Sequence, residues 1–429
     1  MKNQLVLISL NEINFELVKE YLGENNLNNF KFLSEQIKLT DSNEGYSHLE
    51  PWIQWPTIYT GKSANEHKMF RLGDAVNFDY QTIFNDIENL GIKVGAVSPM
   101  NLKNNLKNPS YFIPDPWTKT PSDNNFWSKT ISKTLSYFVK ENTRLNFNIK
   151  YYFFLILIFI KFSRLKNYFL YLKLFFTSLN CKWRKALFLD LLINDIHLKY
   201  FKSKKPGFSN LFLNGFAHVQ HHYMLNGKIK NNKKTNPDWY VNSKLDPIKE
   251  ALYVYNKILD DYLNNDKVSI IVATGLSQVP YDRIKFYYRM KNHQKFFKKF
   301  KIEFQSIQEL MSRDFILNFD NKIDAEKAYK SISNIKDENN KKIFGDLELK
   351  SNSVFISFTY DEEIKNQKIN SDNELLLKNF VNFVAIKNGM HSSKGYIYSD
   401  LSLINSNKIN INEIKKIIFD FFSKEYFAK

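Results

Sequence analysis

Three histidines within a span of five residues are the side chains in this sequence best suited to binding a metal ion. His218, His221 and His222 follow the apolar run 208–213, which predicts a buried strand. A lone histidine is usually structural, but on a helix His218 and His222 would share one face, as paired metal ligands do. We therefore predict that His218 belongs to a site. The alternative is a histidine that hydrogen-bonds to the backbone and holds the strand end in place.

A second group of chemically capable residues lies in the stretch 48–74, HLEPWIQWPTIYTGKSANEHKMFRLGD. This stretch has little hydrophobic periodicity and contains two tryptophans, two prolines and a Thr-Gly pair. Aromatic residues and prolines restrict the backbone, while Gln54 and Lys62 offer polar groups, a combination that is typical of binding loops. We predict a binding loop here, in which Glu50 and Trp52 supply a carboxylate and an aromatic wall.

Polar residues also follow the other predicted strands. Asn11 and Glu12 follow the apolar run 5–10, and Thr274 follows the run 268–273. Strands that alternate with helices predict an α/β fold with a doubly wound, mostly parallel sheet. Such sheets bind ligands at the carboxyl ends of their strands, so these residues are candidates for one site. The alternative for Asn11 is a cap of the following helix.

Taken in chain order, these segments resemble the alkaline phosphatase superfamily, and within it the type I phosphodiesterase and nucleotide pyrophosphatase branch. The segments that carry the resemblance are Trp55–Gly61 with Glu66-His67, the pair Asn214 and His218, and Gly389-Met390-His391 followed by Gly395. The resemblance covers about residues 4–97, 208–280 and 380–400. It implies a sheet with metal ligands at its strand ends.

The resemblance also implies an altered site. The positions of the family's first metal centre and nucleophile are occupied by Asn11, Gln54, Thr274 and Gly275. The positions of the second centre are occupied by Asn214, His218 and His391. Two-metal phosphoryl transfer requires carboxylates to neutralise the ions and a hydroxyl to attack, and Gln54 has no hydroxyl. Most of the replacements still form hydrogen bonds, so we expect a polar pocket with changed chemistry.

We assign the candidate site residues to three roles. The catalytic candidates are Glu12, Gln54 and Thr274; the substrate-binding candidates are Asn11, Trp52, Lys62, Arg71 and Gln278; and the metal candidates are Asn214, His218 and His391. Two imidazoles and an amide favour one zinc ion over magnesium, completed by Glu12, His222 or a ligand oxygen.

Three functions are compatible with these residues. The first is a divergent enzyme that hydrolyses or transfers a small phosphate, sulfate or phosphonate ester. The second is a catalytically inactive module of the same fold that holds a small anionic ligand. The third is a scaffold that contacts a membrane or a partner through residues 150–176. We rank the functions in this order.

The α/β core is expected in three segments, 1–99, 206–300 and 376–429, separated by a helical insertion at 100–205 and a small α+β insertion at 301–375. Within the helical insertion, the apolar run 151–160 has about half the length that a membrane span requires. We expect a helical cap that packs on the core and shapes the pocket entrance, with an interfacial helix as the alternative.

Composition narrows the partners and the location. The net charge of +17 comes from scattered basic residues without a recognition motif, so we expect no nucleic acid and at most a weak attraction to anionic surfaces. The one cysteine, Cys181, fits a reducing compartment. The run 5–10 is too short for a signal peptide, and we expect a cytoplasmic protein. The sequence does not indicate an oligomeric state.

Overall fold

The structure is a computed structural model of the chain, and its residues fall into two compact units. The first unit consists of Met1–Asp282 and Asn388–Lys429, and the second of Arg283–Lys387. The described residues are 4–23, 26–42, 44–140, 148–228, 235–310, 313–370, 375–401, 403–404 and 406–427.

The first unit contains an eight-stranded sheet in the order β16-β2-β15-β6-β1-β5-β3-β4. The strands are β1 (Leu5–Leu10), β2 (Lys38–Asp41), β3 (Val94–Val97), β4 (Tyr111–Ile113), β5 (Phe208–Leu213), β6 (Ser269–Ala273), β15 (Lys394–Ser399) and β16 (Lys408–Asn410). Only β15 runs antiparallel to its neighbours. Every residue of β1 is buried, as expected for a central parallel strand. The predicted doubly wound, mostly parallel α/β fold is confirmed.

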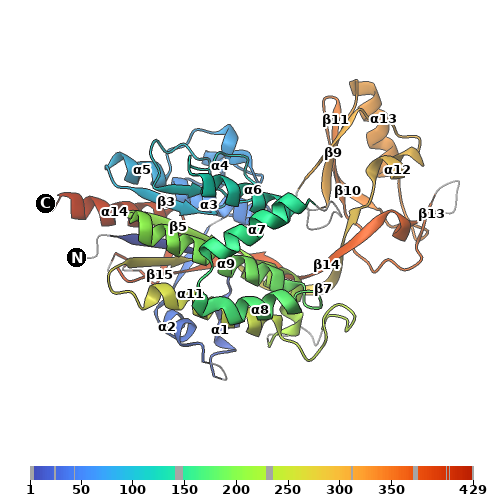
Figure 1. Ribbon diagram of the computed structural model, residues 1–429. Coiled ribbons are helices and arrows are strands. Elements are labelled where there is room, and N and C mark those ends of the chain that lie inside the picture. The colour runs from blue at the N-terminus through green and yellow to red at the C-terminus, as the bar shows by residue number, and fades with distance from the viewer. Residues whose placement is uncertain are drawn as a thin grey trace. The chain divides into compact units, whose positions relative to one another are not determined.

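Helices cover both faces of this sheet, as Figure 1 shows. The helices of this layered core are α1 (Phe15–Lys19), α2 (Asn28–Gln36), α3 (Pro51–Thr60), α4 (Ala64–His67), α5 (Ile83–Asn89), α9 (Trp183–Lys204), α10 (Gly215–Tyr223), α11 (Pro247–Leu263) and α14 (Glu413–Phe427). Alternate residues of β1 point to opposite faces. Leu5 and Leu7 pack in a core with α3, α5 and α14, whereas Val6 and Ile8 pack in a core with α9, α10 and α11.

The stretch 48–74 is predicted to be a binding loop, but its residues Pro51–Thr60 form the helix α3 and Ala64–His67 form α4, so the prediction is wrong in secondary structure over these two segments. Pro51 occupies the first turn, where a missing N–H is tolerated, and Gly61 ends the helix at a φ of 68°. Pro56 lies inside the helix and cannot bond the carbonyl of Trp52. Asn101 satisfies that carbonyl, because its Nδ2 donates to the oxygen at 2.8 Å.

The helical insertion consists of α6 (Phe126–Lys140), α7 (Ile149–Phe162) and α8 (Tyr168–Thr177), which lead into α9. α6 packs on α7, and both α7 and α8 pack on α9. Among the described helices, none combines the length and the apolar character that crossing a bilayer requires.

The second unit has its own four-stranded antiparallel sheet in the order β10-β11-β9-β8. Its elements are α12 (His293–Lys298), β8 (Ser306–Glu309), β9 (Asp314–Asn318), α13 (Lys322–Ser333), β10 (Phe344–Lys350), β11 (Ser353–Phe358), β12 (Lys368–Ile369) and β13 (Leu375–Leu376). The α+β insertion predicted at 301–375 lies within this unit. The boundaries of the unit fall inside two long paired strands, β7 (Ser277–Met290) and β14 (Val381–Ser392).

Candidate metal centre

The ends of three adjacent parallel strands place the candidate residues side by side. In the sheet register Leu10 lies opposite Leu213, and Ser9 lies opposite Ala273. The residues that follow β1, β5 and β6 therefore emerge at one edge of the sheet, as the sequence predicts. They are Asn11 and Glu12, Asn214, and Thr274 with Gly275.

The backbone at Glu12 adopts a conformation that is uncommon for a residue with a side chain. Its φ is 60°, in the left-handed region, where non-glycine residues are usually found only under constraint. Two hydrogen bonds fix this turn: Glu12 N–H donates to the carbonyl of Thr274 at 3.1 Å, and Gln220 Nε2 donates to the carbonyl of Glu12 at 2.7 Å. The constrained turn directs the Glu12 carboxylate toward two histidines.

Glu12, His221 and His391 form a close cluster of three potential metal ligands. Glu12 Oε2 lies 3.0 Å from His221 Nε2 and 3.2 Å from His391 Nε2, and the two imidazole nitrogens are 3.3 Å apart. Glu12 is buried, and the two histidines are partly buried. Glu12 lies in the turn after β1, His221 on α10 and His391 on β14, and all three belong to the first unit.

The Glu12 carboxylate is ionised despite its burial. Burial alone raises its pKa, but the charges of His221 and His391 and their hydrogen bonds outweigh this effect and lower the pKa well below the usual range. The cluster therefore offers one anionic oxygen and two imidazole nitrogens. Two histidines and one carboxylate make up a known ligand set of catalytic zinc sites.

Neutral amides surround and orient the Glu12 carboxylate. Asn11 Nδ2 donates to Glu12 Oε1 at 2.9 Å and to Asn214 Oδ1 at 2.7 Å, and Asn11 Oδ1 accepts from Trp55 Nε1 at 2.8 Å. Gln278 Nε2 donates to Glu12 Oε2. Such outer hydrogen bonds fix the direction of a ligating carboxylate. The alternative role of Asn11 as a helix cap is excluded, because Asn14 caps α1.

A second carboxylate lies on the far side of His391. Glu50 Oε2 is 3.5 Å from His391 Nδ1, and the Glu50 side chain is about one third exposed. A carboxylate behind a ligating histidine fixes the orientation of the ring and raises its basicity. Glu50 precedes α3, so this helix contributes to the centre although it was expected to be a loop.

Two of the predicted metal residues are positioned differently from the cluster. His218 is not among the three clustered ligands; its ring contacts His222, with the centroids 4.8 Å apart. Burial and the neighbouring His221 lower the pKa of His218 to about 4, so this imidazole is neutral near pH 7. The Asn214 amide oxygen accepts from Asn11. The ligand roles of His218 and Asn214 stay predictions.

Of the predicted catalytic residues, only Glu12 belongs to the cluster. Gln54 is buried on α3, and its Nε2 donates to the carbonyl of His48 at 2.9 Å. Within the described part of the chain, the Gln54 Oε1 has no hydrogen-bond partner. The Thr274 hydroxyl accepts from the Tyr396 N–H at 2.9 Å and thus joins β6 to β15.

The predicted substrate-binding residues are dispersed over different environments. Gln278 is buried beside Glu12, whereas Lys62 and Arg71 are exposed. Lys62 Nζ lies 4.8 Å from the centre of the Tyr80 ring. Trp52 Nε1 donates to the carbonyl of Phe70 at 3.2 Å. The substrate-binding roles of these four residues stay predictions.

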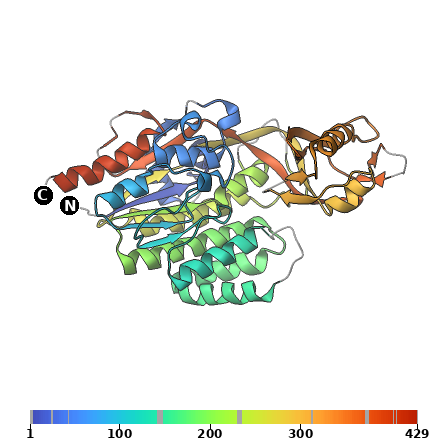
Figure 2. The same cartoon turned by 90° about the horizontal axis from the view of Figure 1, so that it is seen from above.

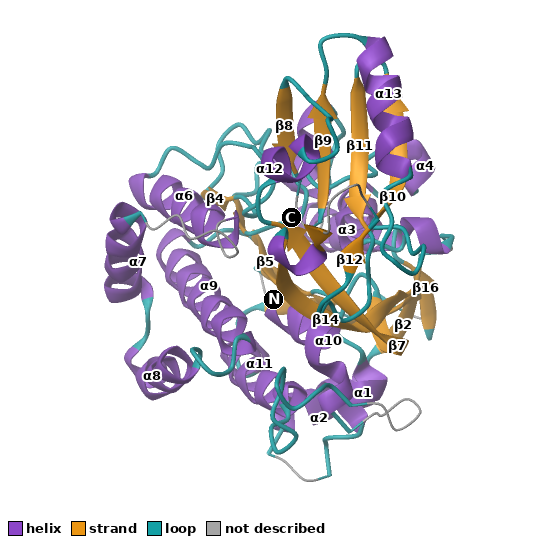
Figure 3. Ribbon diagram, turned by 90° about the vertical axis from the view of Figure 1, so that its right-hand side faces the viewer, coloured by secondary structure: helices purple, strands orange, loops and turns teal. Residues whose placement is uncertain are grey.

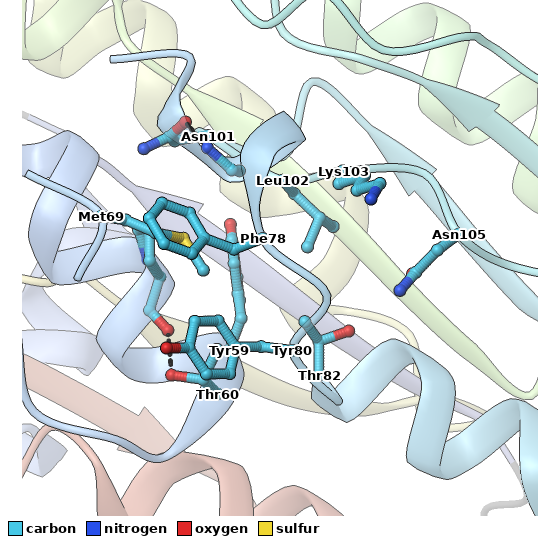
Figure 4. Close-up of a pocket in the computed structure, with 12 residues that line it drawn as sticks. Tyr59, Thr60, Met69, Phe78, Tyr80, Thr82, Asn101, Leu102, Lys103 and Asn105 are labelled. Carbon is cyan, nitrogen blue, oxygen red and sulfur yellow. Dashed lines mark hydrogen bonds between the residues drawn. The ribbon is translucent and has the colours of Figure 1, made fainter. Parts of the chain in front are cut away.

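Figure 4 shows a shallow hollow beside α3 that is separate from the cluster. Its lining includes Tyr59, Thr60, Met69, Phe78, Tyr80 and Asn101. None of Glu12, His221 and His391 lines this hollow. It is mainly apolar, and the ligand-type side chains are not directed into it.

Comparisons with known proteins give a distant structural likeness. The chain is similar to human ectonucleotide pyrophosphatase/phosphodiesterase 5, with 9% identity, a TM-score of 0.40 and coverage of 98% of this chain and 95% of that one. It is also similar to phosphonoacetate hydrolase from Sinorhizobium meliloti in complex with phosphonoacetate, with 9% identity, a TM-score of 0.42 and the same coverage. A third similar structure is the alkaline phosphatase PafA, with 10% identity, a TM-score of 0.40 and coverage of 96% and 94%.

A likeness this distant assigns neither activity nor ligand to the chain. No family model matches the sequence, and no curated protein matches it.

Proposed function

We propose that the chain binds one divalent metal ion, with zinc favoured, through Glu12, His221 and His391, and uses it to hydrolyse or transfer a small phosphate or sulfate ester. The spacing of the three ligand atoms carries this proposal. Atoms about 2.0 Å from a tetrahedral ion lie about 3.3 Å from one another. The observed separations are 3.0, 3.2 and 3.3 Å.

The residues do not fit the two-metal centre that the motif resemblance implies. Asn11 and Asn214 stand where that centre has carboxylates, and these two amides bond each other at 2.7 Å. Gln54 offers no hydroxyl nucleophile, and the Thr274 hydroxyl is engaged with the backbone of β15. We therefore assign no step to a second ion, and we expect no covalent intermediate on residue 54.

The chain's own residues have defined tasks in a one-metal centre. A bound ion would supply Lewis acidity and lower the pKa of a water molecule at an open fourth position. Glu12 and the two histidines would hold the ion, and Asn11 and Gln278 keep the carboxylate aimed at it. The unpartnered Oε1 of Gln54 is a buried acceptor available to a water or a ligand hydroxyl.

The choice of phosphate and sulfate esters as substrates follows from the motif resemblance and from the net charge of the chain. The chain has a net charge of +17, which favours small anionic substrates over cationic ones. A water molecule whose pKa is lowered by a bound metal can attack a phosphate or sulfate ester without a protein nucleophile. The single cysteine, Cys181, is buried and forms no disulfide within the chain, in keeping with the cytoplasmic location that we propose.

The test begins with the metal content of protein purified without chelator. We expect zinc in wild-type protein and in His218→Ala, and its loss in Glu12→Gln and His391→Ala. Activity is then measured on p-nitrophenyl phosphate, bis(p-nitrophenyl) phosphate and p-nitrophenyl sulfate, with chelator-treated protein as the control. Metal binding without turnover of any ester would reject the enzymatic part, and absence of zinc and of every other divalent metal from wild-type protein would reject the whole proposal.

The second candidate function is a catalytically inactive module of the same fold that binds a small anion. The observation that favours it is that Asn11 and Asn214, beside the Glu12 carboxylate, are neutral amides that offer hydrogen bonds but no general acid or base. This module would bind phosphate or sulfate with a heat signal in calorimetry and leave all three esters intact.

A further inference from the structure

The outer faces of α7 and α8 carry a continuous set of exposed apolar side chains, which we name the α7–α8 face. On α7 they recur at helical spacing, and they continue through the following turn and α8. The members are Ile149, Tyr152, Phe153, Ile156, Ile160, Leu165, Phe169, Leu172, Phe175, Phe176 and Leu179. Leu165, Phe169 and Leu179 are each more than 80% exposed. Single exposed apolar residues are ordinary, but a contiguous patch of this kind marks an interaction surface.

The inner faces of the same helices account for their packing. Ile158, Phe162, Tyr171 and Leu174 are buried in the core that also contains α9. Figures 2 and 3 show α7 and α8 on the outside of α9, on the side away from the central sheet. The outer apolar residues therefore do not contribute to the packing of α7 and α8 on α9.

Hydrogen bonds and ion pairs to buried aspartates anchor the turn between α7 and α8. Arg164 Nε donates to Asp195 Oδ1 at 2.6 Å, and its Nη1 donates to Asp261 Oδ1 at 2.7 Å. Tyr171 also donates to Asp195, at 2.9 Å. Asp195 is fully buried, so this corner is anchored in the core, and the neighbouring Leu165 is left at the tip of the turn.

The exposed charged side chains on and beside the α7–α8 face are mainly basic. Residues 142–189 contain no Asp or Glu, and the exposed cations include Lys150, Lys161, Lys173 and Lys182. Lys166 is also exposed, but it pairs with Asp261 at 2.6 Å. An apolar stripe flanked by lysines suits the boundary between the headgroups and acyl chains of an anionic membrane. A second copy of the chain would bring two lysine-rich rims together, which like-charge repulsion disfavours.

We propose that the α7–α8 face docks the protein onto an anionic lipid bilayer as a peripheral, interfacial contact. The apolar side chains enter the headgroup–acyl boundary, and the lysines contact the anionic headgroups. The helices lie in the membrane plane, since neither of them is long and apolar enough to span it. This inference is independent of the metal centre and of the proposed activity.

Vesicle flotation of the full-length chain tests the proposal. We expect the protein to float with phosphatidylcholine vesicles that contain about one third phosphatidylglycerol, and to float poorly with phosphatidylcholine alone. Phe169→Glu combined with Phe176→Glu should weaken binding more than about tenfold. Lys173→Gln combined with Lys182→Gln should weaken it about fivefold per lysine on the anionic vesicles only.

Ile323→Glu is the matched control, because this residue is also an exposed apolar position, 64% exposed, on α13. It should float as wild type does, and all variants should melt at the wild-type temperature. Absence of flotation of wild-type protein, or unchanged flotation of the double phenylalanine variant, would overturn the proposal. Flotation that resists an alkaline carbonate wash would also overturn it, because a peripheral contact is released by that treatment.

Discussion

Replacing His221 by alanine tests whether His221, as the observed geometry indicates, or His218, as the motif resemblance implies, is the metal ligand on α10. The family pattern assigns the ligand position on α10 to His218, whereas the structure places His221 Nε2 at 3.0 Å from Glu12 Oε2. The two residues lie on the same short helix and are both partly buried. His218→Ala is therefore a matched control for His221→Ala.

The expected loss of zinc-dependent stabilisation follows from the number of protein ligands and from mass action. Loss of one of three protein ligands should weaken zinc binding by at least about 100-fold, since loss of an outer hydrogen bond alone weakens it 10–100-fold. At a zinc concentration of about 100 times the wild-type Kd, binding stabilises wild-type protein by about 2.7 kcal/mol. The His221→Ala variant would then gain only about 0.4 kcal/mol.

Thermal melting with and without added zinc is the assay. We expect an increase on the order of 5 °C for wild type and His218→Ala, and less than about 1 °C for His221→Ala. Metal content after gel filtration gives a second readout that does not depend on folding. A zinc shift that persists in His221→Ala and disappears in His218→Ala would refute the assignment of His221 and restore the family spacing.

Three further predictions concern residues that support the site and the insertion. Burial raises the pKa of Asp190 to about 6, although hydrogen bonds from Tyr255 and from the Gly215 N–H oppose the shift. Because this folded pKa exceeds the unfolded value near 4, the protonated Asp190 stabilises the folded state below pH 4. This stability, about 3 kcal/mol, is lost as the pH rises to 6. Urea unfolding at pH 4 and pH 7 should show this loss in wild type and not in Asp190→Asn. A Cβ at Gly389 would collide with Gln278 Oε1 and lie 2.9 Å from the carbonyl oxygen of Gln220. Gly389→Ala should therefore lower stability by about 1–3 kcal/mol and weaken zinc binding, and unchanged calorimetric affinity would contradict the orienting role of Gln278. Arg164→Ala leaves the fully buried Asp195 without its cationic partner, whereas Asp261 keeps its ion pair with Lys166; the change should cost about 3–5 kcal/mol in urea unfolding, and a loss below 1 kcal/mol would show that the corner of the insertion is not anchored by this residue.

The sheet and the edge that carries the site could be predicted from local sequence. The segments Leu5–Leu10 and Phe208–Leu213 are continuous apolar runs, and each forms a fully buried parallel strand. Once the strands are parallel, the residues after them must emerge at one edge. This reasoning brings Asn11, Glu12 and Asn214 together without any knowledge of the tertiary structure.

The choice among the clustered histidines could not be predicted, because it depends on how α10 is rotated against the sheet. Each residue turns the helix by about 100°, so neighbouring histidines face different directions. The rotation is fixed by burial of Phe216 and Val219 in the core and by the bond from Gln220 to the carbonyl of Glu12. These contacts are between segments distant in sequence. The spacing of His221 from Asn214, two helical turns, is the one local signal that was available.

The helix at Pro51–Thr60 escaped prediction for a related reason. A proline inside a helix removes one hydrogen bond and normally argues against helix. Here the carbonyl that Pro56 cannot satisfy accepts from Asn101, a residue in a different part of the chain. This tertiary hydrogen bond helps the chain to tolerate Pro56 inside a helix, and Glu50, at the start of that helix, lies beside His391.

The replacement of carboxylates by amides changes what the centre can attract. A divalent ion held by Glu12 and two neutral imidazoles leaves a formal charge of about +1, since Asn11 and Gln278 beside the carboxylate are neutral. Glu50 is about one third exposed, so solvent screens its charge from the ligand side. A centre lined by several carboxylates would instead cancel the charge of its ion. In the proposed centre an anionic ester would therefore gain an attraction that depends on the bound metal, and we expect its affinity to rise with metal occupancy.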